Sequence, residues 1–113
     1  AWYSGEDSLN LALLALGAGG MVSVVGHLVG DRLAKMAKLF WNGEVETARA
    51  INESLLPVYT GVFRAQGVIL IKAALNLQGL PSGPVRLPLV NATPSEIEQL
   101  RIDLAAGGVV PFA

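Results

Sequence analysis

The stretch that decides the fold is residues 8–30, SLNLALLALGAGGMVSVVGHLVG, which carries no formally charged side chain. It is long enough to cross a bilayer as one helix. Three glycines between residues 17 and 20 interrupt it, and its character changes there from helix-forming leucine and alanine to mainly β-branched residues at 22–25. We therefore expect a helix, a glycine turn and a buried strand at Met21–Val25, as in an α/β layer. Three polar side chains would also be costly in hydrocarbon: Asn10, Ser23 and His27.

The flanking residues extend this pattern on both sides. Residues 2–4 are short and aromatic and predict the end of a strand, Gly5 permits a tight turn, and the residues at 7–8 can cap the following helix. A second amphipathic helix should follow the glycine and histidine at 26–27 and end near Gly43. The order strand, helix, strand, helix requires a parallel sheet, which two strands alone cannot form. Residues 1–43 therefore predict two βα units of a larger sheet whose other strands lie outside this chain.

From Glu44 onward the sequence predicts one helix after another. Apolar residues keep a helical spacing as far as Val62, and Pro57 inside this pattern predicts a kink. Thr93 and Glu96 form a capping box with proline at the first helical position. The predicted helical domain, residues 44–113, thus contains a helix over 45–62, a helix over 68–77, a turn at 81–84, an extended segment at 85–90 and a final helix from 94 to about 105, ended by the glycines at 107–108.

The composition excludes several classes of function. Hydrophobic residues make up 52% of the 113 residues and charged ones 15%, which is too apolar for a disordered chain. The net charge is −1 and no basic run occurs, so nucleic-acid binding is not expected. Without cysteine there are no disulfides or thiolate metal sites, which fits a cytoplasmic protein. The chain begins at Ala1 without an initiator methionine, and we expect it to be part of something longer.

The residues that could carry chemistry have simpler structural interpretations. His27 is the one histidine and cannot form a metal site alone, so we expect no metal. Glu6 and Asp7 could act as acid and base, but adjacent carboxylates before a helix are more often caps. The glycines at 17–20 follow a helix rather than a strand, which is the wrong order for a phosphate loop. Lys72 could form a Schiff base if desolvated, but we favour a structural role.

Several segments taken together resemble the dihydrodipicolinate synthase family. Residues 3–7, YSGED, resemble the family's Ser-Gly-Asp-Asp motif after barrel strand seven, and residues 20–24, GMVSV, resemble its strand eight. Each motif is weak, but their order and spacing across essentially the whole chain are specific. Three later segments also match: residues 48–52, ARAIN; residues 72–75, KAAL; and residues 85–89, VRLPL.

This resemblance implies a fold and an activity. The family has a (β/α)8 barrel, of which this α/β segment would supply strands seven and eight with their helices, followed by a C-terminal helical extension. Its members condense pyruvate with L-aspartate semialdehyde in lysine biosynthesis through a Schiff base on a lysine, without a cofactor. That lysine and the proton-relay tyrosine should lie before residue 1. The resemblance therefore implies no catalytic residue in this chain, which alone should be inactive.

Two residues carry over from the family as substrate-binding positions. Val22 matches a strand-eight residue, usually isoleucine, whose backbone contacts bound pyruvate. Gly5 matches a glycine that lines the pocket after strand seven, where a missing side chain permits close approach. Glu6 stands where the family usually has aspartate. The family further implies a cytoplasmic homotetramer that includes the upstream part of the barrel, with no nucleic acid or membrane as partner.

Other classes remain as alternatives. The chain could belong to a sister lyase, such as N-acetylneuraminate lyase or a keto-deoxy-sugar aldolase, which share the barrel and the Schiff base. It could instead be a small helical interaction module without chemistry. A membrane-associated protein built on residues 8–30 is a further alternative. A strand at Met21–Val25 would argue against the membrane alternative, and a closed helical bundle would argue against the barrel.

Overall fold

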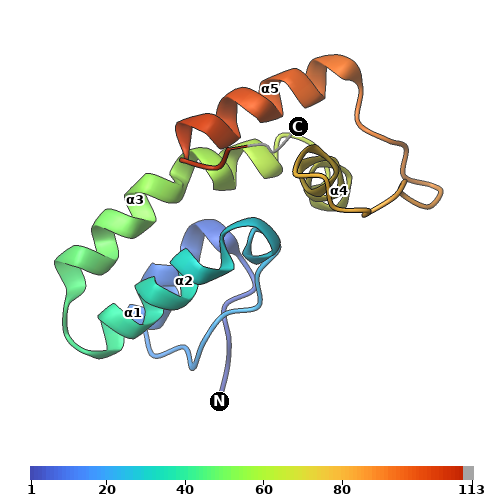
Figure 1. Ribbon diagram of the computed structural model, residues 1–113. Helices are drawn as coiled ribbons and strands as arrows, with labels where there is room; N and C mark the ends of the chain where they lie inside the picture. Colours follow the sequence, from blue (N-terminus) through green and yellow to red (C-terminus); the bar gives the residue numbers. More distant parts are fainter. Residues whose placement is uncertain (111–113) are drawn as a thin grey trace. The chain divides into compact units, whose positions relative to one another are not determined.

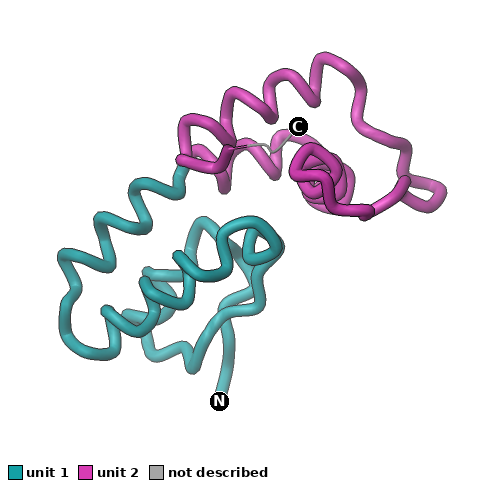
Figure 2. The backbone as a smooth tube through the Cα atoms, viewed as in Figure 1, with its two compact units in different colours: residues 1–56 teal, residues 57–113 magenta. Residues whose placement is uncertain are grey.

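The computed structural model describes residues 1–110, which contain a short 3-10 helix and five α-helices (Figure 1). They divide into two compact units, Ala1–Leu56 and a second that begins at Pro57 (Figure 2). This division falls inside α3. The sequence instead predicts a boundary after residue 43, between the two βα units and the helical domain, and that boundary stays a prediction. The helices are η1 (Asp7–Leu9), α1 (Asn10–Ala15), α2 (Gly26–Trp41), α3 (Val45–Val62), α4 (Gly67–Leu77) and α5 (Pro94–Ala106).

The first unit contains one parallel pairing in place of the two expected strands. The Gly19 N–H donates to the Trp2 carbonyl at 2.8 Å, the Ser4 N–H to the Gly20 carbonyl at 2.9 Å, and the Val22 N–H to the Ser4 carbonyl at 2.8 Å. These bonds form an isolated parallel bridge between Ser4 and Met21, and no strand occurs within residues 1–110. The parallel direction of the pairing agrees with the prediction, but its length does not, because a single bridge stands where two paired strands were expected.

The strand expected at Met21–Val25 is therefore wrong beyond its first residues. The N–H groups of Val24 and Val25 donate to the Asp7 carboxylate instead of a neighbouring strand. The carbonyls of the same two residues accept from His27 and Leu28, which begins the helical turn of α2. With the backbone groups used in this way, none of them remains to extend a ladder.

The helices of the first unit begin and end close to where the sequence predicts. α1 ends before Gly17, whose φ of 103° only glycine adopts readily, and α2 ends before Gly43 with a φ of 84°. The two helices pack against each other, side by side in Figure 1. Because residues 10–15 and 26–41 are separate helices, the uncharged stretch is not one continuous span. Their shared core consists of Leu14, Ala18 and Ala37, with Leu13, Met21 and Phe40 packed against it.

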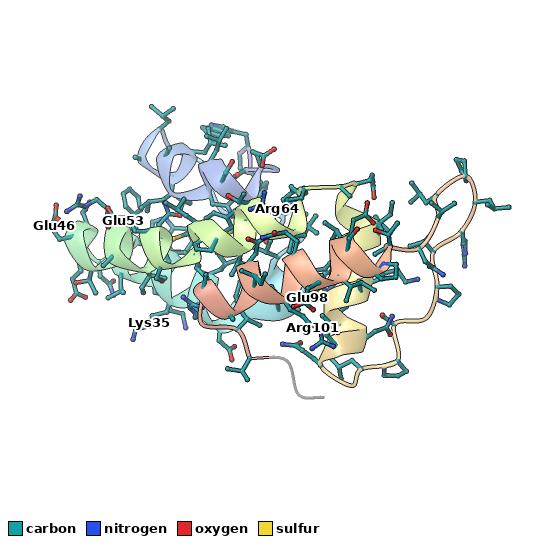
Figure 3. The ribbon with its side chains drawn as sticks, turned by 90° about the horizontal axis from the view of Figure 1, so that it is seen from above. Lys35, Glu46, Glu53, Arg64, Glu98 and Arg101 are labelled. Carbon is teal, nitrogen blue, oxygen red and sulfur yellow. The ribbon has the colours of Figure 1, made fainter. Side chains whose placement is uncertain are left out.

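α3 has the predicted apolar face. The helix is continuous through Pro57, and the kink expected there stays a prediction. Val45, at its first residue, is 47% exposed and does not belong to the buried face. Figure 3 shows Glu46 and Glu53 in the first part of α3, where both pair with the exposed Arg49, an arrangement that adds little stability. The buried positions are Ala48, Leu55, Val58, Tyr59 and Val62.

In the second unit, α4 packs against α5. α4 begins at Gly67 and is capped by the Gln66 side chain, which accepts from the Val68 N–H at 2.7 Å. α5 begins with the predicted capping box, in which Thr93 accepts from the Glu96 N–H and Glu96 accepts from the Thr93 N–H. Its buried face is formed by Leu100, Asp103 and Leu104.

Gly61 permits the close approach of α3 and α5. A Cβ atom at this position would lie 2.5 Å from the Asp103 Cβ, too close for any side chain without a shift of the backbone. We expect Gly61→Ala to lower the free energy of unfolding by about 1–3 kcal/mol, as overpacking does. Urea unfolding followed by circular dichroism measures the change.

Gly30 in α2 provides the matched control for Gly61→Ala. A Cβ at Gly30 meets nothing within 4 Å in the described residues. Gly30→Ala should therefore be neutral or stabilise the helix by up to about 1 kcal/mol. Equal effects of the two substitutions would contradict the assigned contact between Gly61 and Asp103.

The segment between α4 and α5 contains no strand from residue 80 to 93, as Pro88 predicts. The extended conformation expected at residues 85–90 is interrupted by a turn at residues 87–88, where the Leu89 N–H donates to the Arg86 carbonyl at 3.0 Å. The Lys72 ammonium donates to the Pro84 carbonyl at 2.6 Å, and the Ser82 hydroxyl donates to the Lys72 carbonyl at 2.7 Å. These bonds hold the segment against α4. The structural role predicted for Lys72 is therefore confirmed.

Among residues 1–110 no single helix is long and apolar enough to cross a membrane, although the bent pair of α3 and α4 passes that test jointly on length and composition.

Candidate functional site

The parallel pairing brings the two predicted site residues together. Ser4 immediately precedes Gly5, and its carbonyl accepts the N–H of Val22 at 2.8 Å. Both segments run in the same direction, so Gly5 and Val22 follow the bridge at the same edge. Binding sites of parallel α/β proteins form at this carboxyl edge. The geometry thus places a shared surface at Gly5 and Val22.

This surface is open in the described part of the chain. Val22 is 73% exposed, and a Cβ built at Gly5 meets no atom within 4 Å. Gly5 also has no positive φ, so neither its backbone conformation nor its neighbours in residues 1–110 require glycine. Any demand for glycine at this position therefore comes from a group outside these residues. The substrate-binding roles of Gly5 and Val22 stay predictions.

A buried polar network lies directly behind this surface. Asp7 is 2% exposed and accepts the N–H groups of Val24 and Val25, each at 3.0 Å. The same carboxylate accepts from the Asn10 side-chain amide at 3.0 Å and from the Ser23 hydroxyl. The network therefore joins the segment after Gly5 to the segment after Val22.

The local cap predicted at residues 7–8 is wrong. Neither η1 nor α1 has a side-chain cap hydrogen bond. Asp7 instead accepts from the N–H groups of the two residues just before α2, 17 and 18 residues further along the chain. A cap is recognised in a sequence by its spacing within one helical turn. The local sequence therefore does not show whether Asp7 binds N–H groups of its own helix or of a distant segment. Sequence reasoning missed the buried network for this reason.

Ser4 and Asn10 complete the buried network. Both are at most 1% exposed, and the Ser4 hydroxyl donates to the Asn10 side-chain carbonyl at 2.7 Å. The Glu6 side chain is exposed and accepts from the exposed Ser8 hydroxyl at 3.3 Å. The adjacent carboxylates of Glu6 and Asp7 thus have different environments and do not form an acid–base pair. No group of three potential metal ligands occurs among residues 1–110.

The remaining candidates do not add chemistry to this site. His27 is exposed in the first turn of α2. A cavity of about 360 Å³ lies between α4 and residues 83–97, lined by Lys72, Asn76 and Asn91. All three polar side chains form hydrogen bonds with the backbone of residues 83–85. We therefore assign them a role in holding this segment rather than in binding a ligand.

The family, the sequence relatives and the solved structures that resemble this chain all point to the same group of enzymes. The model of the dihydrodipicolinate synthetase family matches residues 1–106. The 4-hydroxy-tetrahydrodipicolinate synthase 2 of Streptomyces coelicolor is 61% identical over 96% of this chain, and the corresponding synthase of Acidothermus cellulolyticus is 52% identical over 100%. The crystal structure of the Cyanidioschyzon merolae enzyme with lysine bound superposes with a TM-score of 0.91 at 40% identity, covering 97% of this chain.

This chain covers a much smaller fraction of each relative than each relative covers of this chain. The chain spans 36% and 37% of the lengths of the two curated relatives and 37% of the solved structure. The described residues form one parallel bridge and no strand, so they do not by themselves display a barrel. The family match nevertheless covers nearly the whole chain. The chain therefore belongs to the dihydrodipicolinate synthetase family.

Proposed function

We propose that this chain is part of a lyase that condenses pyruvate with L-aspartate semialdehyde through a Schiff base, as 4-hydroxy-tetrahydrodipicolinate synthase does. The observation that carries this proposal is the pairing of the two motif-bearing segments, which joins Gly5 and Val22 at one carboxyl edge. Relatives named for this synthase at 61% and 52% identity favour it over the sister lyases. Within the lyase, these residues supply a wall of the pyruvate pocket.

The side chains present in this chain indicate which parts of the reaction it can support. The covalent step needs a lysine amine that attacks the pyruvate ketone. Lys72 is engaged with the Pro84 carbonyl, and the lysines of α2, Lys35 and Lys38, are exposed on a helix. The Schiff-base lysine and the proton-relay tyrosine are expected upstream of residue 1. The role left to Val22 is a backbone contact to pyruvate, which needs no particular side chain, and Gly5 leaves room beside it.

The open apolar surface of the first unit supports a place within a larger barrel. A groove of about 370 Å³ is lined by apolar residues of α2 and by Met21 at the bridge. Trp41 at its end is 56% exposed, and Trp2 beside the pairing is 46% exposed. Surfaces of this kind usually face a partner. We propose that the upstream part of the same barrel covers them in a cytoplasmic homotetramer.

A chimera tests the proposed function. The matching segment of the Streptomyces coelicolor synthase is replaced by this chain, whose 61% identity favours correct packing. The chimera should turn over pyruvate and aspartate semialdehyde within about tenfold of the parent kcat/KM. A chimera with the parent's circular dichroism but more than about 100-fold lower turnover contradicts the proposal.

Gly5→Leu in the chimera tests the pocket wall. A Cβ atom at position 5 meets nothing within 4 Å in residues 1–110, so we expect a loss to report on space beyond them. We expect the KM for pyruvate to rise more than about tenfold. Ala106→Leu, on an exposed residue at the end of α5, is the control and should leave KM unchanged. An unchanged KM with Gly5→Leu would remove Gly5 from the site.

A further inference from the structure

Asp7 is a buried carboxylate with a complete set of partners. Its Oδ2 atom accepts the backbone N–H groups of Val24 and Val25, each at 3.0 Å. Its Oδ1 atom accepts the Asn10 amide at 3.0 Å and the Ser23 hydroxyl. At 2% exposure it has no access to solvent in the described part of the chain. Three of its four donors belong to residues 23–25.

These four donors make the burial of a charge tolerable. An ionised carboxylate is costly to bury unless hydrogen bonds replace its hydration. Bonds to an ionised acceptor are stronger than neutral ones, and two donors on each oxygen fix the plane of the carboxylate. Asp7 therefore has no free lone pair with which to act as a base or to bind a metal. Its role in this structure is to hold the backbone of residues 24 and 25 in place.

The backbone held by Asp7 is the segment that immediately follows Val22. On one side of Val22, its own N–H donates to the Ser4 carbonyl at 2.8 Å. On the other side, Ser23 donates to Asp7 and accepts from the Gly26 N–H at 2.9 Å. Within residues 1–110 the Val22 carbonyl itself accepts no hydrogen bond. Val22 is thus fixed by its neighbours while its carbonyl stays available.

We infer that Asp7 is a positioning residue, which fixes the Val22 peptide and thereby the carbonyl that meets pyruvate. Three of its four partners lie 16–18 residues away, so it joins the two segments after Gly5 and before α2 into one rigid edge. The substrate part of this inference rests on the proposed function of Val22. The anchoring of residues 23–25 by Asp7 does not.

Asp7→Asn in the chimera tests the inference. The asparagine keeps the shape, but it replaces one acceptor oxygen by an NH2 group that faces a donor. We expect the KM for pyruvate to rise at least about tenfold while kcat falls less, because binding geometry is lost rather than the nucleophile. The amides of Val24 and Val25 should exchange with solvent at least about tenfold faster.

The reciprocal swap provides the rescue. In Asp7→Asn/Asn10→Asp the new side-chain amide at position 7 can donate to the new carboxylate at position 10, which also accepts from the Ser4 hydroxyl. The contact between positions 7 and 10 is thus restored with the charge moved, while the Ser23 hydroxyl turns to accept from the amide at position 7. This double variant should recover most of the lost affinity for pyruvate. Asp31→Asn, an exposed acid of α2, makes the same charge change outside the network and should have no effect.

The outcomes separate the inference from the proposed function. A folded Asp7→Asn chimera with a KM for pyruvate within about twofold of the unsubstituted chimera overturns the positioning role. If that variant does not fold, Ser23→Ala removes one donor of the four and is measured in its place, with the same criterion. An unsubstituted chimera without turnover contradicts the proposed function, and the amide exchange of Val24 and Val25 then decides whether Asp7 anchors them.

Discussion

Leu104→Ala is expected to lower the free energy of unfolding by about 2–5 kcal/mol. Leu104 is 0% exposed in α5, and Leu100 one turn earlier is 1% exposed. The loss combines the transfer free energy of the removed carbons with the cavity that remains. Urea unfolding measures the total, and hydrogen exchange of the α5 amides assigns it to this unit.

Ile102 supplies the control on the same helix. It is 55% exposed, so Ile102→Ala removes little buried surface and gains helix propensity. Its effect should stay within about 0.5 kcal/mol. If Leu104→Ala and Ile102→Ala had similar effects, the side of α5 that faces the core would be assigned wrongly.

Asp103→Ala is expected to lower the free energy of unfolding by about 1–3 kcal/mol, as loss of charge-assisted hydrogen bonds does. Arg64 donates to both carboxylate oxygens of Asp103, at 2.6 and 3.1 Å, and Gln99 donates at 3.2 Å. Figure 3 shows Arg64, just after α3, beside α5. The Arg64 side chain is 48% exposed and stays hydrated when its partner is lost, which keeps the effect moderate.

The Asp103 interaction also has a predicted pH dependence. The hydrogen bond from Arg64, opposed by burial and aided by Gln99, holds the pKa of Asp103 below its usual value. A lowered pKa in the folded state means that the stabilisation is complete above the unfolded pKa of about 3.9 and is lost as the pH falls through the folded value. The difference between the parent and Asp103→Ala should therefore be constant from neutral pH to about pH 5 and shrink below about pH 4. A difference that grows on acidification would contradict the ion pair.

Local signals made most helix boundaries predictable. Gly17 and Gly43 adopt the positive φ values that end α1 and α2, and the capping box of Thr93 and Glu96 begins α5. These features act within one helical turn, so their residues are adjacent in the sequence. The surface at Gly5 and Val22 was predictable in a different way, from an ordered set of family motifs.

Contacts between distant residues were not predictable. The strand expected after Met21 is replaced by a turn because Asp7 takes the N–H groups of Val24 and Val25. The close approach of Gly61 to Asp103 likewise joins residues far apart in the chain. A β-branched run favours a strand only where a neighbouring strand accepts its hydrogen bonds. In residues 1–110 the pairing stops at one bridge.

The most direct test of the proposed pocket wall is a crystal structure of the chimera with pyruvate bound. We predict the pyruvate adduct at the edge formed by Gly5 and Val22, with the Val22 backbone within about 3–3.5 Å of it, as a direct polar contact requires. Asp7 should lie behind that edge with its four donors unchanged. Pyruvate bound elsewhere, with Val22 and Gly5 out of contact, would contradict the account.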